Sequence, residues 1–91
     1  MKKPHGNLWF VYILRCADGS LYTGITNDVK RRCRQHTNGT ASRYTRSRRP
    51  CKLVWQEAHR SRSSALKREA AIKTWTRREK LALIRWRKQA G

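Results

Sequence analysis

Two tyrosines flank a short turn near the start of the chain, and an arginine and a histidine follow soon after. Tyr12 and Tyr22 lie at nearly equal distances from the turn, and Arg32 and His36 come next. Phenol and imidazole groups can transfer protons when their surroundings adjust their pKa values, and a guanidinium group binds oxyanions. These side chains could therefore act together on an anionic substrate, provided that the fold gathers them.

The length of the turn decides whether the two phenols lie on the same face of a hairpin, because side chains alternate along a strand. A two-residue loop, Asp18-Gly19, would place Tyr12 and Tyr22 on opposite faces. A three-residue loop, residues 17–19, pairs Tyr12 with Gly24 and puts both phenols on one face. In that register Gly24 leaves space over the sheet. The alternative is that both tyrosines are ordinary core residues of an amphipathic hairpin.

Helical periodicity directs further polar side chains inward. In a helix over 29–37, Arg32 and His36 fall on the same inward stripe as Val29. In a later helix, Glu69 lies in the middle of an apolar face. The local explanation for Glu69 is an ion pair with Lys73, four residues on.

Only five acidic residues occur, and most of them have local roles. Asp18 suits the turn, Asp28 suits the start of a helix, and Glu79 completes a capping box with Thr76. Glu57 ends a strand and is expected near solvent. Glu69 is therefore the acid that we expect in the interior, where a carboxylate must be paired, protonated or bound to a metal.

The charge of the chain indicates its partner. Twenty-three Lys and Arg against five Asp and Glu give a formal charge of +18, which attracts a dense polyanion, so nucleic acid is the expected partner. We expect no membrane association, because the apolar positions are needed for the core. Three cysteines without a CxxC spacing favour a reducing compartment, and hence the cytoplasm, over a disulfide framework or a zinc site.

The order of the elements predicts an α+β fold, with a small three-stranded antiparallel sheet flanked by helices in the order β-β-α-β-α-α. A chain of 91 residues forms one domain, which we place at residues 9–87, with flexible ends at 1–8 and 88–91. Residues 40–50 read as a basic loop rich in Ser and Thr. The expected strands are 9–15, 21–25 and 53–55; the expected helices are 29–37, 64–73 with Ser63 as its cap, and 76–87.

These residues together resemble the GIY-YIG nuclease domain, particularly its small stand-alone bacterial members. Phe10-Val11-Tyr12 is similar to the first motif and Tyr22-Thr23-Gly24 to the second. Arg32 matches the family arginine, His36 the residue one helical turn later, and Glu69 the metal-binding glutamate. The order and spacing of these motifs make the resemblance specific over most of the chain.

The chain departs from the family pattern at two places. Phe10 stands where the first glycine is expected, and it removes no reactive group. No asparagine occurs after Asn38, although many nucleases of the family use one beyond the glutamate.

The resemblance implies hydrolysis of phosphodiester bonds at one site with a single divalent ion, Mg²⁺ or Mn²⁺. Glu69 would hold the ion and Arg32 would bind the scissile phosphate. Tyr12 would act as general base or orient the attacking water, and a base role requires nearby cations to lower its pKa. Tyr22 and His36 would assist by hydrogen bonding.

Further residues are expected to contact nucleic acid around this site. The densest cationic cluster lies in the loop over 40–50, and its contacts to phosphates would carry no sequence information. The alternative is a solvated flexible loop. One tyrosine among these arginines could stack on an unpaired base. The full set is Gly24, Arg31, Arg43, Tyr44, Arg46, Arg48, Arg49 and Lys73.

The sequence therefore supports a metal-dependent endonuclease with little sequence specificity; it does not choose between DNA and RNA, and we favour DNA as the partner. The alternative is a non-catalytic domain that binds DNA or RNA on the same scaffold, and a third possibility is a small basic structural protein without a pocket. We expect a monomer or a weak homodimer, with Leu83 and Trp86 on the last helix available for a contact.

Overall fold

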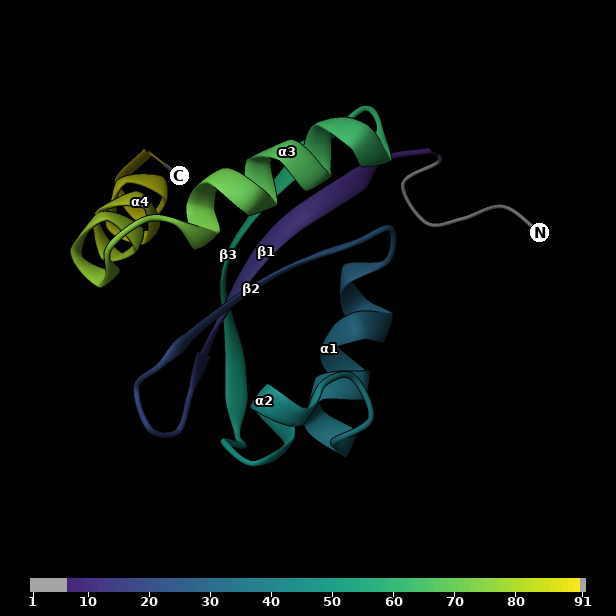
Figure 1. The fold of residues 1–91 in the computed structure, drawn as a ribbon, viewed down its shortest axis with the longest axis vertical. Helices are drawn as coiled ribbons and strands as arrows, with labels where there is room; N and C mark the ends of the chain where they lie inside the picture. Colours follow the sequence, from purple (N-terminus) through teal and green to yellow (C-terminus); the bar gives the residue numbers. More distant parts are fainter. Residues whose placement is uncertain (1–6, 91) are drawn as a thin grey trace.

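The protein has the predicted α+β architecture, a three-stranded antiparallel sheet with helices on both faces (Figure 1). A computed structural model describes residues 7–90, and the strand order is β2-β1-β3. Of the ends predicted to be flexible, 1–8 and 88–91, residues 1–6 and 91 fall outside the described residues, whereas 88–90 belong to the last helix. The strands are β1 Trp9–Cys16, β2 Leu21–Thr26 and β3 Cys51–His59; the helices are α1 Val29–Asn38, α2 Arg43–Arg46, α3 Arg62–Lys73 and α4 Arg77–Ala90.

The hairpin between β1 and β2 has the three-residue loop. The amide of Cys16 donates to the carbonyl of Ser20 at 2.9 Å, and Gly19 takes a left-handed φ of 83°. Asp18 accepts hydrogen bonds from the amide and the hydroxyl of Ser20, which closes the turn. As predicted, Tyr12 pairs with Gly24, so the strands place both tyrosines on one face.

The third strand is longer than the predicted 53–55. It runs over Cys51–His59 beside β1, with an irregularity at Val54 between the pairs Ile13–Trp55 and Leu14–Leu53. The extra residue shifts the pairing by one position, so that Cys51 lies directly opposite Cys16 at the end of β1.

Capping side chains determine where the helices begin. Asp28 caps α1, and the Thr76-Glu79 capping box precedes α4, as predicted. The prediction of Ser63 as the cap of α3 is wrong, because Ser61 accepts from the amide of Ser64. The segment over 40–50 contains the short helix α2, capped by Ser42, instead of a continuous loop.

The sheet separates two differently built layers. Helices α3 and α4 cover one face, where Val11 and Ile13 of β1 pack with Ala65, Ile72 and other apolar residues. Helices α1 and α2 lie against the opposite face (Figure 1). Within residues 7–90, no helix has the length and apolar character needed to cross a membrane.

Candidate active site

A buried chain of hydrogen bonds runs from the sheet into α1 and α2. The Tyr12 hydroxyl lies 2.9 Å from Nε2 of His36, and Nδ1 of His36 lies 2.7 Å from Oγ1 of Thr45. Oγ1 of Thr45 is in turn 3.0 Å from the hydroxyl of Ser42, the cap of α2. Tyr12, His36 and Thr45 are at most 2% exposed. Both ring nitrogens of His36 therefore have fixed partners in the protein interior.

The second tyrosine joins the same cluster. The ring centroid of Tyr22 lies 6.4 Å from that of Tyr12 and 5.2 Å from that of His36. On its other side Tyr22 contacts Tyr44 of α2, with ring centroids 5.8 Å apart. Tyr22 is half-buried and Tyr44 is 39% exposed, so this ring cluster extends from the interior to the surface.

Gly24 is needed for the position of Tyr12. A Cβ atom at Gly24 would lie 2.6 Å from the Tyr12 hydroxyl oxygen and 2.7 Å from the ring carbon that bears it. The prediction that Gly24 leaves open space over the sheet is therefore wrong. The phenol of Tyr12 occupies that space, and only a residue without a side chain fits beneath it.

Burial controls the protonation of both partners in the central hydrogen bond. Desolvation and the neighbouring Tyr22 raise the pKa of Tyr12 well above its usual value, although the Arg32 guanidinium acts in the opposite direction. Arg32 alone therefore does not supply the lowering that a general-base role of Tyr12 requires, and the phenol is neutral at neutral pH. Burial and Arg32 lower the pKa of His36, which favours a neutral imidazole that can accept a proton.

Arg32 and Glu69 approach the Tyr12 phenol from different helices. Arg32 is half-buried on α1, whereas Glu69 comes from α3, whose core residues pack on the opposite face of the sheet. The charges of both side chains nevertheless act on the Tyr12 hydroxyl. The expectation that one face of the sheet carries all four residues therefore holds for the tyrosines and the α1 residue, while Glu69 belongs to the other layer.

The Glu69 carboxylate already has a cationic partner. Its Oε2 lies 3.2 Å from Nζ of Lys73, and the Glu69 side chain is 16% exposed against 54% for Lys73. The local ion pair considered from the sequence is therefore present. It neutralises an acid that is otherwise largely enclosed.

Glu69 offers a single carboxylate, which suits only an ion that takes most of its ligands from water and substrate. Among the described residues, no three His, Cys, Asp or Glu side chains lie close enough to form a metal centre. Mg²⁺ is typically bound through one or two carboxylates, together with waters and substrate phosphate oxygens. A single carboxylate such as that of Glu69 fits that pattern.

The loop arginines divide into two groups. Nε of Arg48 lies 3.1 Å from Oδ2 of Asp18, and its guanidinium stacks 3.9 Å from the ring centroid of Tyr44. Arg49 donates to the carbonyl of Thr37. These two arginines hold α2 against the hairpin turn and α1, which a solvated flexible loop would not require.

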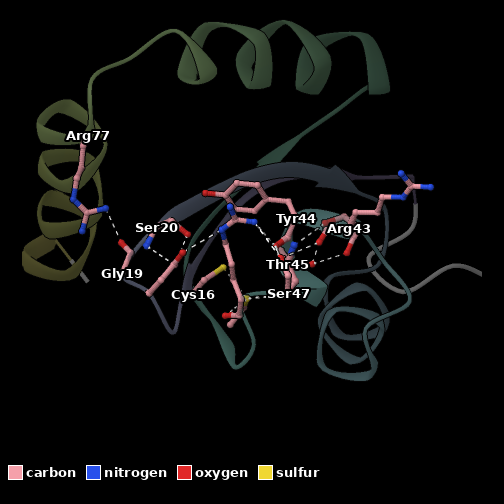
Figure 2. Close-up of polar contacts among 12 residues, drawn as sticks. Cys16, Gly19, Ser20, Arg43, Tyr44, Thr45, Ser47 and Arg77 are labelled. Atoms are coloured by element: carbon pink, nitrogen blue, oxygen red, sulfur yellow. Dashed lines mark hydrogen bonds and ion pairs between the residues drawn. The ribbon is translucent and has the colours of Figure 1, made fainter.

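Three other arginines of the predicted interface are exposed to solvent. Arg43 and Arg46 lie on α2, and the Arg43 side chain extends away from the sheet (Figure 2). Arg31 lies on α1. They add positive charge to the exposed surface of these two helices.

Sequence reasoning missed two residues of the hydrogen-bonded chain. Thr45 and Ser42 lie in the segment predicted as a polar loop; the Ser42-to-Thr45 spacing of a capped turn was the available signal. Glu57, with 29% of its side chain exposed, lies closer to solvent than Glu69, as predicted. Its carboxylate is 2.8 Å from Nε2 of His59 and 3.1 Å from Nε of Arg68, so it joins β3 to α3.

Comparison with known proteins agrees with this architecture. The model of the GIY-YIG catalytic domain matches residues 8–82. UPF0213 proteins of Staphylococcus aureus strains Mu3 and N315 are 54% identical over 78 residues, covering 86% of this chain and 95% of theirs. The solution NMR structure of the UPF0213 protein BH0048 from Bacillus halodurans superposes with a TM-score of 0.57 at 43% identity, covering 87% of this chain and 84% of that one.

Proposed function

The chain belongs to the GIY-YIG catalytic domain family, and we propose that it is a divalent-metal-dependent endonuclease that hydrolyses phosphodiester bonds with little sequence specificity. The family is one of nucleases, so nucleic acid is the substrate class. The formal charge of +18 supports strong binding to the phosphate backbone. DNA as the preferred substrate, a monomeric or weakly dimeric state and a cytoplasmic location are parts of the same proposal.

The observation that carries the proposal is the buried bond between Tyr12 and His36, with Arg32 and Glu69 acting on the same phenol. A core tyrosine has no need of a fully buried histidine partner, a guanidinium and a carboxylate. Phosphodiester hydrolysis needs these groups, because water must be oriented, a proton must be accepted and the charge on the phosphate must be neutralised.

In this proposal, Tyr12 orients the attacking water as a neutral phenol. Its hydroxyl donates to Nε2 of His36, and Nδ1–H of His36 donates to Thr45, so the unprotonated nitrogen of the imidazole accepts from Tyr12. A proton arriving at the Tyr12 oxygen can then pass on to His36. The raised pKa of Tyr12 is compatible with this route, because no phenolate has to exist beforehand.

Arg32 would bind the scissile phosphate, and Tyr22, which is half-buried in the ring cluster, would donate a hydrogen bond to a phosphate oxygen. Glu69 would hold one Mg²⁺ or Mn²⁺. When bound, such an ion neutralises charge on the phosphate oxygens and assists the leaving oxygen. Lys73 would leave its ion pair with Glu69 and bind a phosphate of the nucleic-acid strand instead.

The ion pair of Lys73 with Glu69 favours the second candidate, a non-catalytic nucleic-acid-binding domain. The Lys73 ammonium offsets the charge of the Glu69 carboxylate and repels a divalent ion, so a lasting pair would weaken metal binding at Glu69. The two candidates therefore differ in whether Glu69 is needed for cleavage.

A cleavage screen tests the proposal. Branched, single-stranded and duplex DNA and RNA are incubated with Mg²⁺ or Mn²⁺, with and without EDTA, and the products are resolved on denaturing gels. We expect cleavage that EDTA stops and that Glu69→Gln reduces by roughly 10³-fold, with salt-dependent binding retained. Binding without cleavage for every substrate and ion would establish the non-catalytic candidate instead.

A further inference from the structure

Two cysteines lie opposite one another where β1 ends and β3 begins. Cys16 and Cys51 are direct partners across the antiparallel strands, and their Sγ atoms are 2.7 Å apart. Both are free thiols. A disulfide bond has an S–S length of about 2.05 Å, so bond formation requires only a small further approach of the sulfurs. The third cysteine, Cys33, lies on α1 and has no place in this strand pair.

Small surface hollows reach the pair from two sides. Cys51 lines a hollow of about 410 Å³ together with Arg49 and Pro50. Cys16, although only 4% exposed, lines another of about 270 Å³ together with Arg15 and Lys52. Cationic side chains therefore border both approaches. They favour a small reagent that carries negative charge.

We propose that Cys16 and Cys51 form a reversible thiol–disulfide exchange site, whose oxidant is a small anionic disulfide of the glutathione type. One protein thiol, as the thiolate, attacks a sulfur of the reagent and releases one reagent thiol. The second protein thiol then attacks the mixed disulfide and releases the other. The two cysteines lose two electrons and two protons, and one reagent disulfide becomes two thiols.

The site stands apart from the proposed active site but shares helix α2 with it. The thiol of Cys51 is 3.8 Å from the carbonyl of Thr45 and 3.5 Å from that of Arg48, to which it acts as a weak donor. Oxidation removes this donor and joins the end of β1 to the start of β3 beside α2. The inference does not depend on nuclease activity.

The surroundings predict slow exchange at neutral pH. Burial, with the neighbouring thiol of Cys16 and the carboxylate of Asp18, raises the pKa of Cys51 to about 12, while Arg48 acts in the opposite direction. The thiolate is the reacting form, so the exchange rate should rise with pH throughout the range below that value.

The experiment uses the full chain carrying Cys33→Ser, so that only the strand pair can react. Incubation with glutathione disulfide at pH 7 and pH 9, followed by intact mass measurement, should show the loss of two hydrogens, faster at pH 9 and reversed by dithiothreitol. Peptide mapping without reductant should recover Cys16 joined to Cys51. The oxidised form should melt roughly 5–15 °C above the reduced one.

Two matched variants complete the test. Cys16→Ser or Cys51→Ser, each combined with Cys33→Ser, should stop at a single glutathione adduct and show no such rise in melting temperature. A melting temperature independent of oxidation, or glutathione adducts without the internal bond in the Cys33→Ser chain, would overturn the proposal.

Discussion

The two faces of the sheet use the same strand for different purposes. Toward α3 and α4, β1 contributes Val11 and Ile13 to a core of aliphatic and aromatic side chains. Toward α1 and α2, the next residue, Tyr12, meets His36 and Thr45 in an equally buried layer held by hydrogen bonds. The faces therefore differ in chemistry, not in depth of burial.

Neighbouring residues of β1 therefore have different roles: those on the apolar face stabilise the fold, and Tyr12 on the polar face serves the proposed chemistry. The apolar face contributes most to folding, because burying hydrocarbon is favourable without directional requirements. The polar face gains little net stability from each hydrogen bond, since the same groups bond to water in the unfolded chain. Because the polar face contributes little to stability, we attribute its arrangement to function: the proposed chemistry needs Tyr12, His36 and Thr45 in fixed positions.

Within the polar face, the largest expected effect is that of Tyr12→Phe, which removes one oxygen. If Tyr12 orients the water and passes a proton to His36, cleavage should fall by roughly 10²-fold. The loss of one buried hydrogen bond should reduce the free energy of unfolding by only about 1 kcal/mol. Single-turnover cleavage and urea unfolding of the same preparation measure the two quantities.

The matched change on the apolar face is Ile13→Val, one residue along the same strand. Removing a buried methylene should cost about 0.5–1.5 kcal/mol of stability and leave the cleavage rate within about twofold of the wild type. If Tyr12→Phe lowered stability as Ile13→Val does while cleavage was unchanged, the polar face would be ordinary core and the proposed role of Tyr12 would be wrong.

A smaller effect is expected at Thr45, which acts on the site through His36. Thr45→Val keeps the shape of the side chain but leaves Nδ1 of His36 without its partner, so the imidazole loses its fixed tautomer and orientation. We expect cleavage to fall roughly tenfold through kcat, with little change in KM. Thr45→Ser retains the hydroxyl and should recover most of the rate. Equal losses in the Val and Ser variants would indicate that Thr45 only packs.

The apolar face and the hairpin were largely predictable from the sequence, because their signals are local. The turn residues Asp18 and Gly19 determine the register of β1 and β2, and the caps of α1 and α4 lie within four residues of the groups that they bond. The register alone put both tyrosines on one face. A short-range pattern therefore predicted the part of the site that lies on the hairpin.

The remaining part depends on contacts between segments distant in the chain. Thr45 reaches His36 only because a four-residue helix packs beneath α1, and a helix this short carries no periodicity to detect. Cys16 meets Cys51 only through the pairing of β3 with its extra residue at Val54. The net upward shift of the pKa of Tyr12 likewise follows from burial, which the sequence does not reveal.

The pH dependence of stability offers a further comparison of the faces. Burial lowers the pKa of His36 below its ordinary value of 6.5, so the unfolded chain binds a proton more readily than the folded one. The stabilisation is therefore complete above pH 6.5 and is lost as the pH falls through the lower pKa of the folded state. One site can contribute a slope of at most about 1.4 kcal/mol per pH unit in that window.

His36→Gln should remove this slope below pH 6.5, whereas Ile13→Val should shift the stability curve downward without changing its shape. Urea unfolding between pH 5 and pH 8 at constant ionic strength measures both. A slope that persists in His36→Gln would show that other groups titrate there and that the polar face is not responsible.

The smallest effect is expected at the exposed rim of the polar face, where Arg43 and Arg46 extend from α2. Each phosphate contact contributes about −0.9 to the slope of log affinity against log salt concentration. Arg43→Ala with Arg46→Ala should therefore weaken binding to all sequences about equally and flatten that slope by up to about two contacts' worth. Fluorescence anisotropy with two unrelated duplexes, over a range of salt concentrations, measures this.

The matched control for this rim replaces Arg48 and Arg49 with alanine. These arginines bond to Asp18 and to the Thr37 carbonyl, so their loss should lower stability and loosen α2, a result distinct from a pure change in salt dependence. If the Arg43 and Arg46 variant keeps the slope of the wild type, nucleic acid does not pass over α2. The strand would then have to approach the ring cluster from the side of α1, where Arg31 is exposed.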